Sequence, residues 1–284
     1  MRFLTKSKKV KRGILLSIII ICVLSSTFIV SVFWLNQSVG SQYFRGYDDG
    51  IKRADQNNEY ESLNITKQLN EEYSLTLNNV YLGIKRIVIS YTLTSENGKI
   101  PLDYNNEEIS KKCSISIDDI EYDNVAVTLD SNVIEGNTLK GALLLDESNY
   151  GTDFVLAESP IFKVSFNNLL NIDKNLNFEF HVHKPSITKD QIDFEFKYKN
   201  KKYVIKSIEL DPITTTLNFS KATDISGIRI VQNTEEYQAI TISNKGQHYI
   251  SFPAVQRGIP FTVYIGDERF HTSTAERIYT HTFE

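Results

Sequence analysis

Two histidines and a glutamate form the pattern in this sequence that is best suited to chemistry. Glu179, His181 and His183 occur at positions i, i+2 and i+4. Side chains at this spacing project from the same face of a β-strand, because successive side chains of a strand point to opposite faces. Two neutral imidazoles and a carboxylate can share a metal ion such as zinc. The alternative interpretation is a solvated strand face opposite the apolar side chains of the same strand.

Other arrangements of catalytic residue types match no known motif. The sequence contains no Gly-x-Ser-x-Gly nucleophile elbow, no P-loop and no EF-hand spacing. Adjacent acidic pairs such as Glu71-Glu72 are better explained as surface charge, since catalytic carboxylates must face one another across a substrate. We therefore expect a protein that is not an enzyme and that binds no cofactor.

A hydrophobic segment predicts a single transmembrane helix at residues 13–35. The segment contains no charged side chain and ends in Phe33-Trp34-Leu35. At about 1.5 Å per helical residue it reaches roughly 35 Å, enough for a hydrocarbon core of about 30 Å. Six basic residues precede it, so the positive-inside rule places residues 1–12 in the cytoplasm as a basic tail and the C-terminal region outside the cell. A cleaved signal peptide is the alternative, but its apolar region should be about 7 to 15 residues long.

Charge is distributed unevenly along the 284 residues. The chain has 31 Lys and Arg and 35 Asp and Glu, a formal net charge of -4, and no acidic residue occurs before Asp48. Without the six basic residues of the tail, 25 basic residues remain against 35 acidic ones, a net charge of -10 for the rest of the chain. An acidic surface argues against nucleic acid as a partner, because duplex binding depends on Lys and Arg that neutralise phosphates.

From Leu63 onward, apolar and polar residues alternate with the period of β-strands. One example is residues 87–93, in which Ile87, Ile89 and Tyr91 share a face. Polar Ser90, Thr92 and Thr94 fill the other side, as expected for a sheet that is wetted on one face.

The two cysteines have different surroundings and cannot pair with each other. Cys22 lies inside the hydrophobic segment, whereas Cys113 alternates with Ser114 and Ser116 at an apolar position of a predicted strand. The sequence therefore offers no disulfide framework and no cysteine-based zinc site. We expect Cys113 to be a small core hydrophobe rather than a reactive thiol.

Short strands separated by turns rich in Asn, Asp, Gly and Ser predict an all-β fold. We expect two immunoglobulin-like β-sandwiches after the transmembrane helix, at residues 62–184 and 185–284, preceded by a juxtamembrane linker or short helix at 36–61. Pro185 suits the boundary between them. One of the strands expected in the second sandwich covers residues 239–242. A single continuous two-sheet body is the alternative.

Six short stretches of the extracytoplasmic region resemble two domains of a bacterial protein family. The first half resembles the uncharacterised extracytoplasmic domain that follows the membrane span in many anti-sigma-factor-like proteins of Gram-positive bacteria, at residues 49–54, 63–66, 73–77 and 85–93. Residues 205–212 and 258–260 are similar to the immunoglobulin-like domain that often accompanies it. Members of this family that act as anti-sigma factors carry a folded cytoplasmic domain that holds the sigma factor. Residues 1–12 are too few to form that domain, so direct sequestration of a sigma factor is not expected.

Three functions are consistent with these features. The first is a non-enzymatic, single-pass protein of the cell membrane, a sensor or regulatory interaction protein whose partner is an envelope protein or the cell wall. The second is an envelope enzyme or metal-dependent binding protein that uses Glu179, His181 and His183; stoichiometric zinc that is lost on His181→Ala would favour it. The third is a structural adhesin, which binding to isolated cell wall would test.

Overall fold

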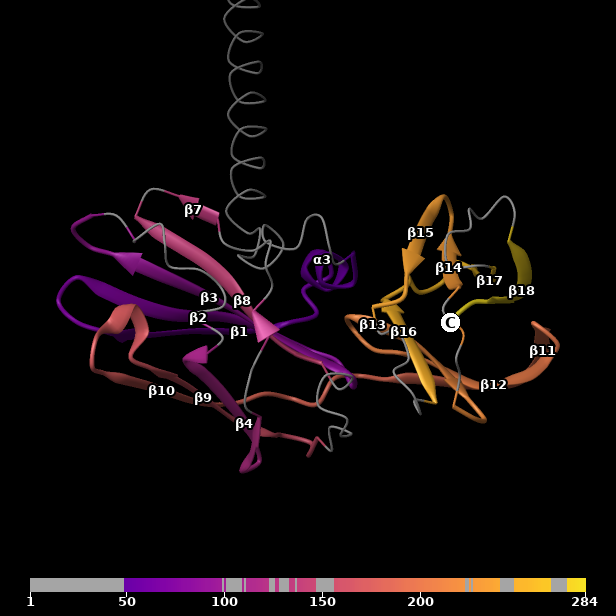
Figure 1. The fold of residues 1–284 in the computed structure, drawn as a ribbon, viewed down its shortest axis with the longest axis horizontal. Coiled ribbons are helices and arrows are strands. Elements are labelled where there is room, and N and C mark those ends of the chain that lie inside the picture. The colour runs from indigo at the N-terminus through magenta and orange to yellow at the C-terminus, as the bar shows by residue number, and fades with distance from the viewer. Residues whose placement is uncertain are drawn as a thin grey trace, which may run out of the picture. The chain divides into compact units, whose positions relative to one another are not determined.

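The described part of the chain consists of β-sheets and a short helix. The computed structural model describes residues 49–98, 100, 109, 111–122, 126–127, 133–135, 137–146, 156–222, 225, 227–240, 248–266 and 275–284. These residues form four antiparallel sheets (Figure 1), which confirms the predicted all-β class. Contacts place all of these residues in one compact unit. The predicted transmembrane segment, 13–35, lies outside the described residues, and no helix within them is long and apolar enough to span a membrane.

Two sheets, A and B, make up what we call the first sheet pair. Its strands are β1 (Glu61–Gln68), β2 (Tyr73–Leu82), β3 (Arg86–Ser95), β4 (Cys113–Ile117), β5 (Ile120–Tyr122), β6 (Ala126–Val127), β7 (Val133–Glu135), β8 (Thr138–Asp146), β9 (Ile161–Asn167) and β10 (Asn175–His181), with a 3-10 turn at Leu169–Asn171. Sheet A has the order β1-β2-β3-β8-β6, with β7 also paired to β8, and sheet B has the order β10-β9-β4-β5.

A hydrophobic cluster lies between sheets A and B. Tyr91 of β3 contacts Phe166 of β9 edge-on, with ring centroids 6.2 Å apart. Cys113 belongs to the same cluster and is buried, and burial raises the pKa of its thiol. The prediction that Cys113 is a core residue is therefore confirmed, because the period-two alternation of β4 turns it toward sheet A.

Gly141 of β8 leaves room for the ring of Tyr91 in this core. The two residues are partners in the β3–β8 register, and a Cβ at position 141 would overlap the Oη and Cζ atoms of Tyr91. Because this ring is fully buried, it cannot swing into solvent. We expect Gly141→Ala to lower the free energy of unfolding by about 1–3 kcal/mol in urea denaturation. In a Tyr91→Leu background the same change should cost much less, and an equal cost in both backgrounds would contradict the steric explanation.

Sheets C and D form the second sheet pair. Its strands are β11 (Thr188–Tyr198), β12 (Lys201–Leu210), β13 (Thr214–Phe219), β14 (Ile228–Gln232), β15 (Glu235–Gln238), β16 (Tyr249–Pro253), β17 (Phe261–Ile265) and β18 (Glu276–His281). Sheet C has the order β11-β12-β13-β16, and sheet D has the order β15-β14-β17-β18. A separate hydrophobic cluster joins them, in which Phe194 of β11 lies 4.8 Å from Tyr279 of β18, measured between ring centroids.

The strand expected at residues 239–242 is wrong at Ala239 and Ile240, and residues 241–242 lie outside the described residues. Ala239 and Ile240 follow the end of β15 at Gln238. The buried residue of β15 is Tyr237, which pairs with Ile230 of β14. The chain then crosses to sheet C, where the backbone N–H of Ile240 donates to the carbonyl oxygen of Ser251.

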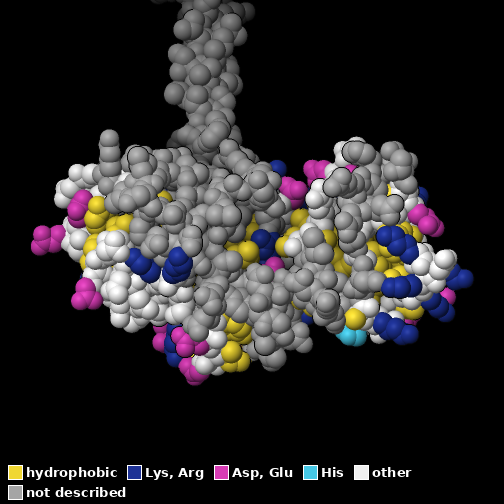
Figure 2. Space-filling view, in the orientation of Figure 1, with side chains coloured by type: hydrophobic (Ala, Val, Ile, Leu, Met, Phe, Trp, Pro, Cys, Tyr) yellow, Lys and Arg dark blue, Asp and Glu magenta, His cyan; other side chains and the backbone are white. Residues whose placement is uncertain are grey.

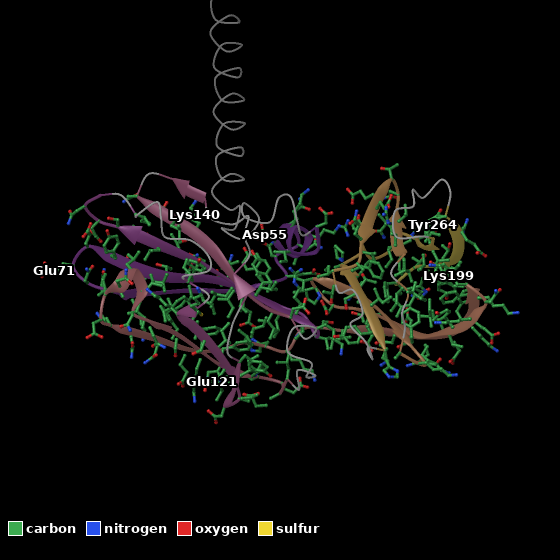
Figure 3. All side chains as sticks on the ribbon, viewed as in Figure 1. Asp55, Glu71, Glu121, Lys140, Lys199 and Tyr264 are labelled. Carbon is green, nitrogen blue, oxygen red and sulfur yellow. The ribbon has the colours of Figure 1, made fainter. Side chains whose placement is uncertain are left out.

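Helix α3 (Asp49–Gln56) lies within the predicted linker segment and packs on the outer face of sheet A (Figure 1). Its Ile51 and Ala54 are fully buried in a cluster with Tyr81 of β2 and Val88 of β3. The hydroxyl of Tyr81 donates to Oδ1 of Asp55 at 2.8 Å, and Figure 3 labels Asp55 on the helix. The apolar face of α3 is therefore part of the protein core.

The expectation of a sheet wetted on one face is wrong at Ser90. This residue is fully buried on the face that also carries Val88, and its hydroxyl accepts a hydrogen bond from the backbone N–H of Asn79 at 3.0 Å. Thr92 and Thr94, farther along β3, are partly exposed as expected. The difference arises because α3 covers the end of this face at which Val88 lies.

Candidate functional site

The three residues predicted as metal ligands lie on the exposed side of β10 and just beyond its end. Glu179 and His181 are exposed in β10, and His183 is exposed two residues farther on. Nδ1 of His183 lies 2.8 Å from Oε1 of Glu61 in β1. Among the residues that the structure describes, no three His, Cys, Asp or Glu side chains form a group that could hold a metal ion. The metal site therefore stays a prediction, and the contact found for His183 is with Glu61.

A second region brings together buried charges and close backbone contacts from segments far apart in the sequence. We call it the α3 junction. It consists of α3, the turn between β2 and β3 (residues 83–85), the turn between β12 and β13 (211–213) and the residues that follow β16 (254–257). This region joins the first sheet pair to the second.

Asp211 is the central side chain of the α3 junction. It is only 4% exposed, and its carboxylate accepts four hydrogen bonds. Three come from its own turn: the backbone N–H groups of Ile213 and Thr214 at 2.9 and 2.8 Å, and the hydroxyl of Thr214 at 2.6 Å. The fourth comes from the first sheet pair, where the backbone N–H of Ile84 donates at 2.9 Å. Burial raises the pKa of Asp211, and these donors oppose that shift because they favour the charged carboxylate.

A buried arginine lies close to this carboxylate. Arg86, the first residue of β3, is buried, and burial lowers the pKa of its guanidinium to about 10. The negative charges of Asp146, at the end of β8, and of Asp211 oppose this shift. Charged groups from β3, β8 and the β12–β13 turn thus compensate one another inside the protein, as buried charges must.

Two glycines permit the close approach of the segments in the α3 junction. A Cβ on Gly50 of α3 would overlap the carbonyl oxygen of Ile213 and would lie 2.9 Å from the backbone nitrogen of Ala254. A Cβ on Gly83 would lie 2.8 Å from Oδ1 of Asp211. At both positions a larger residue would push the first sheet pair away from the second, because the obstructing atoms are backbone or tightly held.

Arg53 of α3 contacts three groups of the second sheet pair. Its Nη2 donates to Oε2 of Glu235 at 2.8 Å, and its Nη1 donates to the carbonyl oxygen of Ala254. Its guanidinium carbon also lies 4.6 Å from the ring centroid of Tyr237. Burial lowers the pKa of Arg53, and the charge of Glu235 opposes that shift. One side chain thus binds a carboxylate, a carbonyl and an aromatic face of the second sheet pair.

We expect Arg53→Lys to lower the free energy of unfolding by about 1 kcal/mol, because lysine cannot reproduce the planar, multidentate contact. Urea denaturation of Arg53→Lys, Glu235→Gln and the double variant would measure the coupling between the two side chains. The ion pair alone should contribute only a few tenths of a kcal/mol, since the Glu235 side chain is 67% exposed. A cost of Arg53→Lys that vanishes in the Glu235→Gln background would contradict the roles of Tyr237 and the Ala254 carbonyl.

A cavity of about 630 Å³ opens beside the α3 junction. Its lining includes the charged side chains of Arg53, Arg257, Glu59 and Asp211 and the amide side chains of Asn57 and Gln256. Burial raises the pKa of Glu59, and a hydrogen bond from Asn57 and the charge of Arg257 oppose that shift. The lining has the size and polarity to admit a small polar molecule, and its positive and negative charges are balanced.

Sequence reasoning missed the residues of the α3 junction. Asp211 and Pro212 enter the sequence analysis only within residues 205–212, the stretch that is similar to the immunoglobulin-like domain. A signal was present, since Asp followed by Pro favours a turn in which the carboxylate accepts backbone N–H groups. The position of Gly50 inside a short amphipathic helix was a second signal of a close approach.

The comparisons with known proteins leave the family open. No family model matches the chain, and no curated protein matches it. A solved structure described as that of the conserved domain protein from Bacillus anthracis is similar over 78% of this chain and 85% of that chain, with 13% sequence identity and a TM-score of 0.46. This similarity is too low to support an argument about fold or function.

Proposed function

We propose that this protein is a non-enzymatic, membrane-anchored interaction protein whose two immunoglobulin-like sandwiches lie outside the cell. The observation that carries the proposal is the packing of α3. This helix follows the predicted transmembrane segment in the sequence, yet Ile51 and Ala54 are fully buried and Gly50 contacts the backbone of the second sheet pair. A partner bound to either sheet pair would therefore act on a helix that leads to the anchor.

The two sheet pairs support the immunoglobulin-like part of the proposal. Each consists of two antiparallel sheets around its own hydrophobic cluster, an arrangement typical of β-sandwiches. The resemblance to anti-sigma-factor-like ectodomains supports an extracytoplasmic, regulatory role. In this role the partner is an envelope protein or the cell wall, and any signal passes through the membrane by complex formation or proteolysis.

Protease treatment of intact cells tests the proposed topology. With one epitope tag at each end of the full chain, the C-terminal tag should be lost from intact cells while the N-terminal tag is retained until the membrane is disrupted. A C-terminal tag that survives in intact cells would overturn the topology. Loss of the N-terminal tag from the mature protein, with the rest released from the membrane fraction, would indicate a cleaved signal peptide instead.

Crosslinking in native membranes tests the interaction role. We expect a defined envelope component to be captured by the wild-type protein. The Gly141→Ala variant is expected to be less stable, since position 141 lies in the core of the first sheet pair. Crosslinking of this variant shows how far capture depends on stability alone. Capture of the same component by an unrelated single-pass protein would contradict a specific interaction.

A further inference from the structure

Helix α3 is the element through which the two sheet pairs share an apolar cluster. The cluster contains Ile51 and Ala54 of α3, buried residues of β2, β3 and β8 in the first sheet pair, and Ile213 of the β12–β13 turn. Among the buried residues that the structure describes in this cluster, Ile213 alone belongs to the second sheet pair. Removal of α3 would therefore uncover the one apolar side chain that the second sheet pair places there.

The remaining contacts of α3 with the second sheet pair are mainly polar. Arg53 donates to the carboxylate of Glu235 and to the carbonyl oxygen of Ala254, and its guanidinium lies over the ring of Tyr237. Figure 2 shows basic and acidic side chains beside hydrophobic ones where the two sheet pairs meet. Contact regions of this polar kind between two parts of one chain permit relative motion, unlike large hydrophobic ones.

Helix α3 is too short to remain a helix away from this site. It has eight residues, and isolated helices shorter than about 12–15 residues are marginal in water. Gly50 lowers its helix propensity further. Its buried apolar side chains are those of Ile51 and Ala54. The helix therefore depends on its packing site, and it should unfold when it leaves that site.

Each sheet pair has its own hydrophobic core that does not depend on α3. The cluster between sheets A and B includes Val164 of β9, and the cluster between sheets C and D includes Val263 of β17. Both side chains are fully buried. Among the described residues, neither cluster includes a side chain of α3. Because local unfolding starts in units with few buried apolar contacts, α3 should leave before either core opens.

The direct hydrogen bond between the sheet pairs lies next to the surface that α3 covers. The backbone N–H of Ile84 donates to the buried carboxylate of Asp211 at 2.9 Å. Ile213 follows two residues later, and its carbonyl oxygen lies against Gly50 of α3. If α3 left, water would reach this turn. The attraction between the charges of Asp211 and Arg86 would then weaken, because water has a much higher dielectric constant than a protein interior.

We propose that α3 is a latch: it holds the two sheet pairs together, and it leaves its site as one unit while both pairs stay folded, which opens the α3 junction. The inference rests on the proposed function for its trigger, a pull between the membrane anchor and a partner bound to a sheet pair. Helix α3 is the first described element after the predicted anchor, so such a pull acts on α3 before it acts on any strand. Binding of a partner under tension thus regulates the junction.

Hydrogen exchange of the purified full chain tests the order of opening. After correction for intrinsic rates, the amides of α3 and of Ile84 should exchange at least about tenfold faster than those of Val164 and Val263. Their exchange should also depend less on urea, because opening of the latch exposes less surface than global unfolding. Equal exchange of all these amides would overturn the proposal, since α3 would then open only together with the whole protein.

The Ile51→Asp variant should hold the latch open, because an unpaired carboxylate is unstable in an apolar cluster. We expect the amides of α3 and of Ile84 to exchange at least about 100-fold faster than in the wild type, while those of Val164 and Val263 stay at least about 100-fold slower than in an unstructured peptide. Lost protection at Val164 and Val263 would mean that folding requires α3. Retained protection at Ile84 would mean that the sheet pairs stay joined without α3. Either result would overturn the proposal.

Gln56→Asp is the matched control, since it introduces the same charge at an exposed position of α3. It should change the exchange of these amides by less than about threefold. An effect as large as that of Ile51→Asp would contradict the latch, because added charge rather than lost packing would then explain the opening. The exchange measurements do not depend on orientation in the membrane. A latch that fails here and a topology that fails under protease treatment are therefore separate results.

Discussion

Asp211→Ala is expected to lower the free energy of unfolding by about 3–5 kcal/mol. The substitution leaves the backbone N–H groups of Ile84, Ile213 and Thr214 without their acceptor inside the protein. It also removes one of two carboxylates that compensate the buried guanidinium of Arg86. Because Ile84 belongs to the first sheet pair, the loss should loosen the α3 junction as well as the β12–β13 turn. Urea denaturation of the full chain measures the cost.

Two further variants make this prediction specific. Asp211→Asn keeps the shape and one acceptor oxygen but places an amide NH₂ against donors, so its cost should be smaller than that of alanine and still above about 1 kcal/mol. Asp173→Ala removes an exposed aspartate and should change the stability by less than about 0.5 kcal/mol. If Asp211→Ala cost no more than Asp173→Ala, the central role of Asp211 in the α3 junction would be refuted.

The second large effect is expected at Gly50. In an isolated helix, replacing glycine with alanine stabilises by up to about 1 kcal/mol. At position 50 the sign should reverse, and we expect a loss of about 2–3 kcal/mol, because the new methyl group would overlap the carbonyl oxygen of Ile213. That carbonyl is fixed by a hydrogen bond from the backbone N–H of Ala254 at 3.1 Å, so it cannot move freely.

Gly98→Ala is the matched control for Gly50→Ala. A Cβ at position 98 would meet no atom within 4 Å. Its effect on the free energy of unfolding should therefore stay within about 0.5 kcal/mol, or be slightly stabilising through the lower entropy of the unfolded chain. Hydrogen exchange adds a local measurement, since the amides of α3 should lose protection in Gly50→Ala and keep it in Gly98→Ala. A stabilising Gly50→Ala would mean that α3 does not pack against the second sheet pair.

Most of the fold that could be predicted from the sequence followed from the period-two alternation of apolar and polar residues. This alternation predicted strands at β3 and β10 and put Cys113 of β4 in the core. This was possible because alternation is a local property: one buried face selects every second residue. The prediction was wrong at Ala239 and Ile240 for the same reason, since these two apolar residues continue the local pattern after β15 has ended.

The contacts of the candidate site could be predicted from residue spacing only in part. Spacing alone put Glu179 and His181 on one face of a strand, and they are indeed exposed on β10. Spacing could not show that Glu61, 122 residues before His183, would be the side chain that His183 contacts. The α3 junction has no spacing signature, because its contacts join residues such as Ile84 and Asp211 that are 127 positions apart.

The sequence by itself determined that this protein is all-β, that residues 36–284 are acidic, with a net charge of -10, and that residues 13–35 are hydrophobic enough to predict an anchor. Each of these follows from composition or from the local alternation of apolar and polar residues. Both can be read from neighbouring residues without knowing the rest of the structure. Only the tertiary structure decided that α3 is part of the core, that Ser90 is buried and that Asp211 joins the two sheet pairs. Those outcomes depend on which distant surfaces meet, and a buried charge or a missing Cβ has meaning only when the atoms opposite it are known.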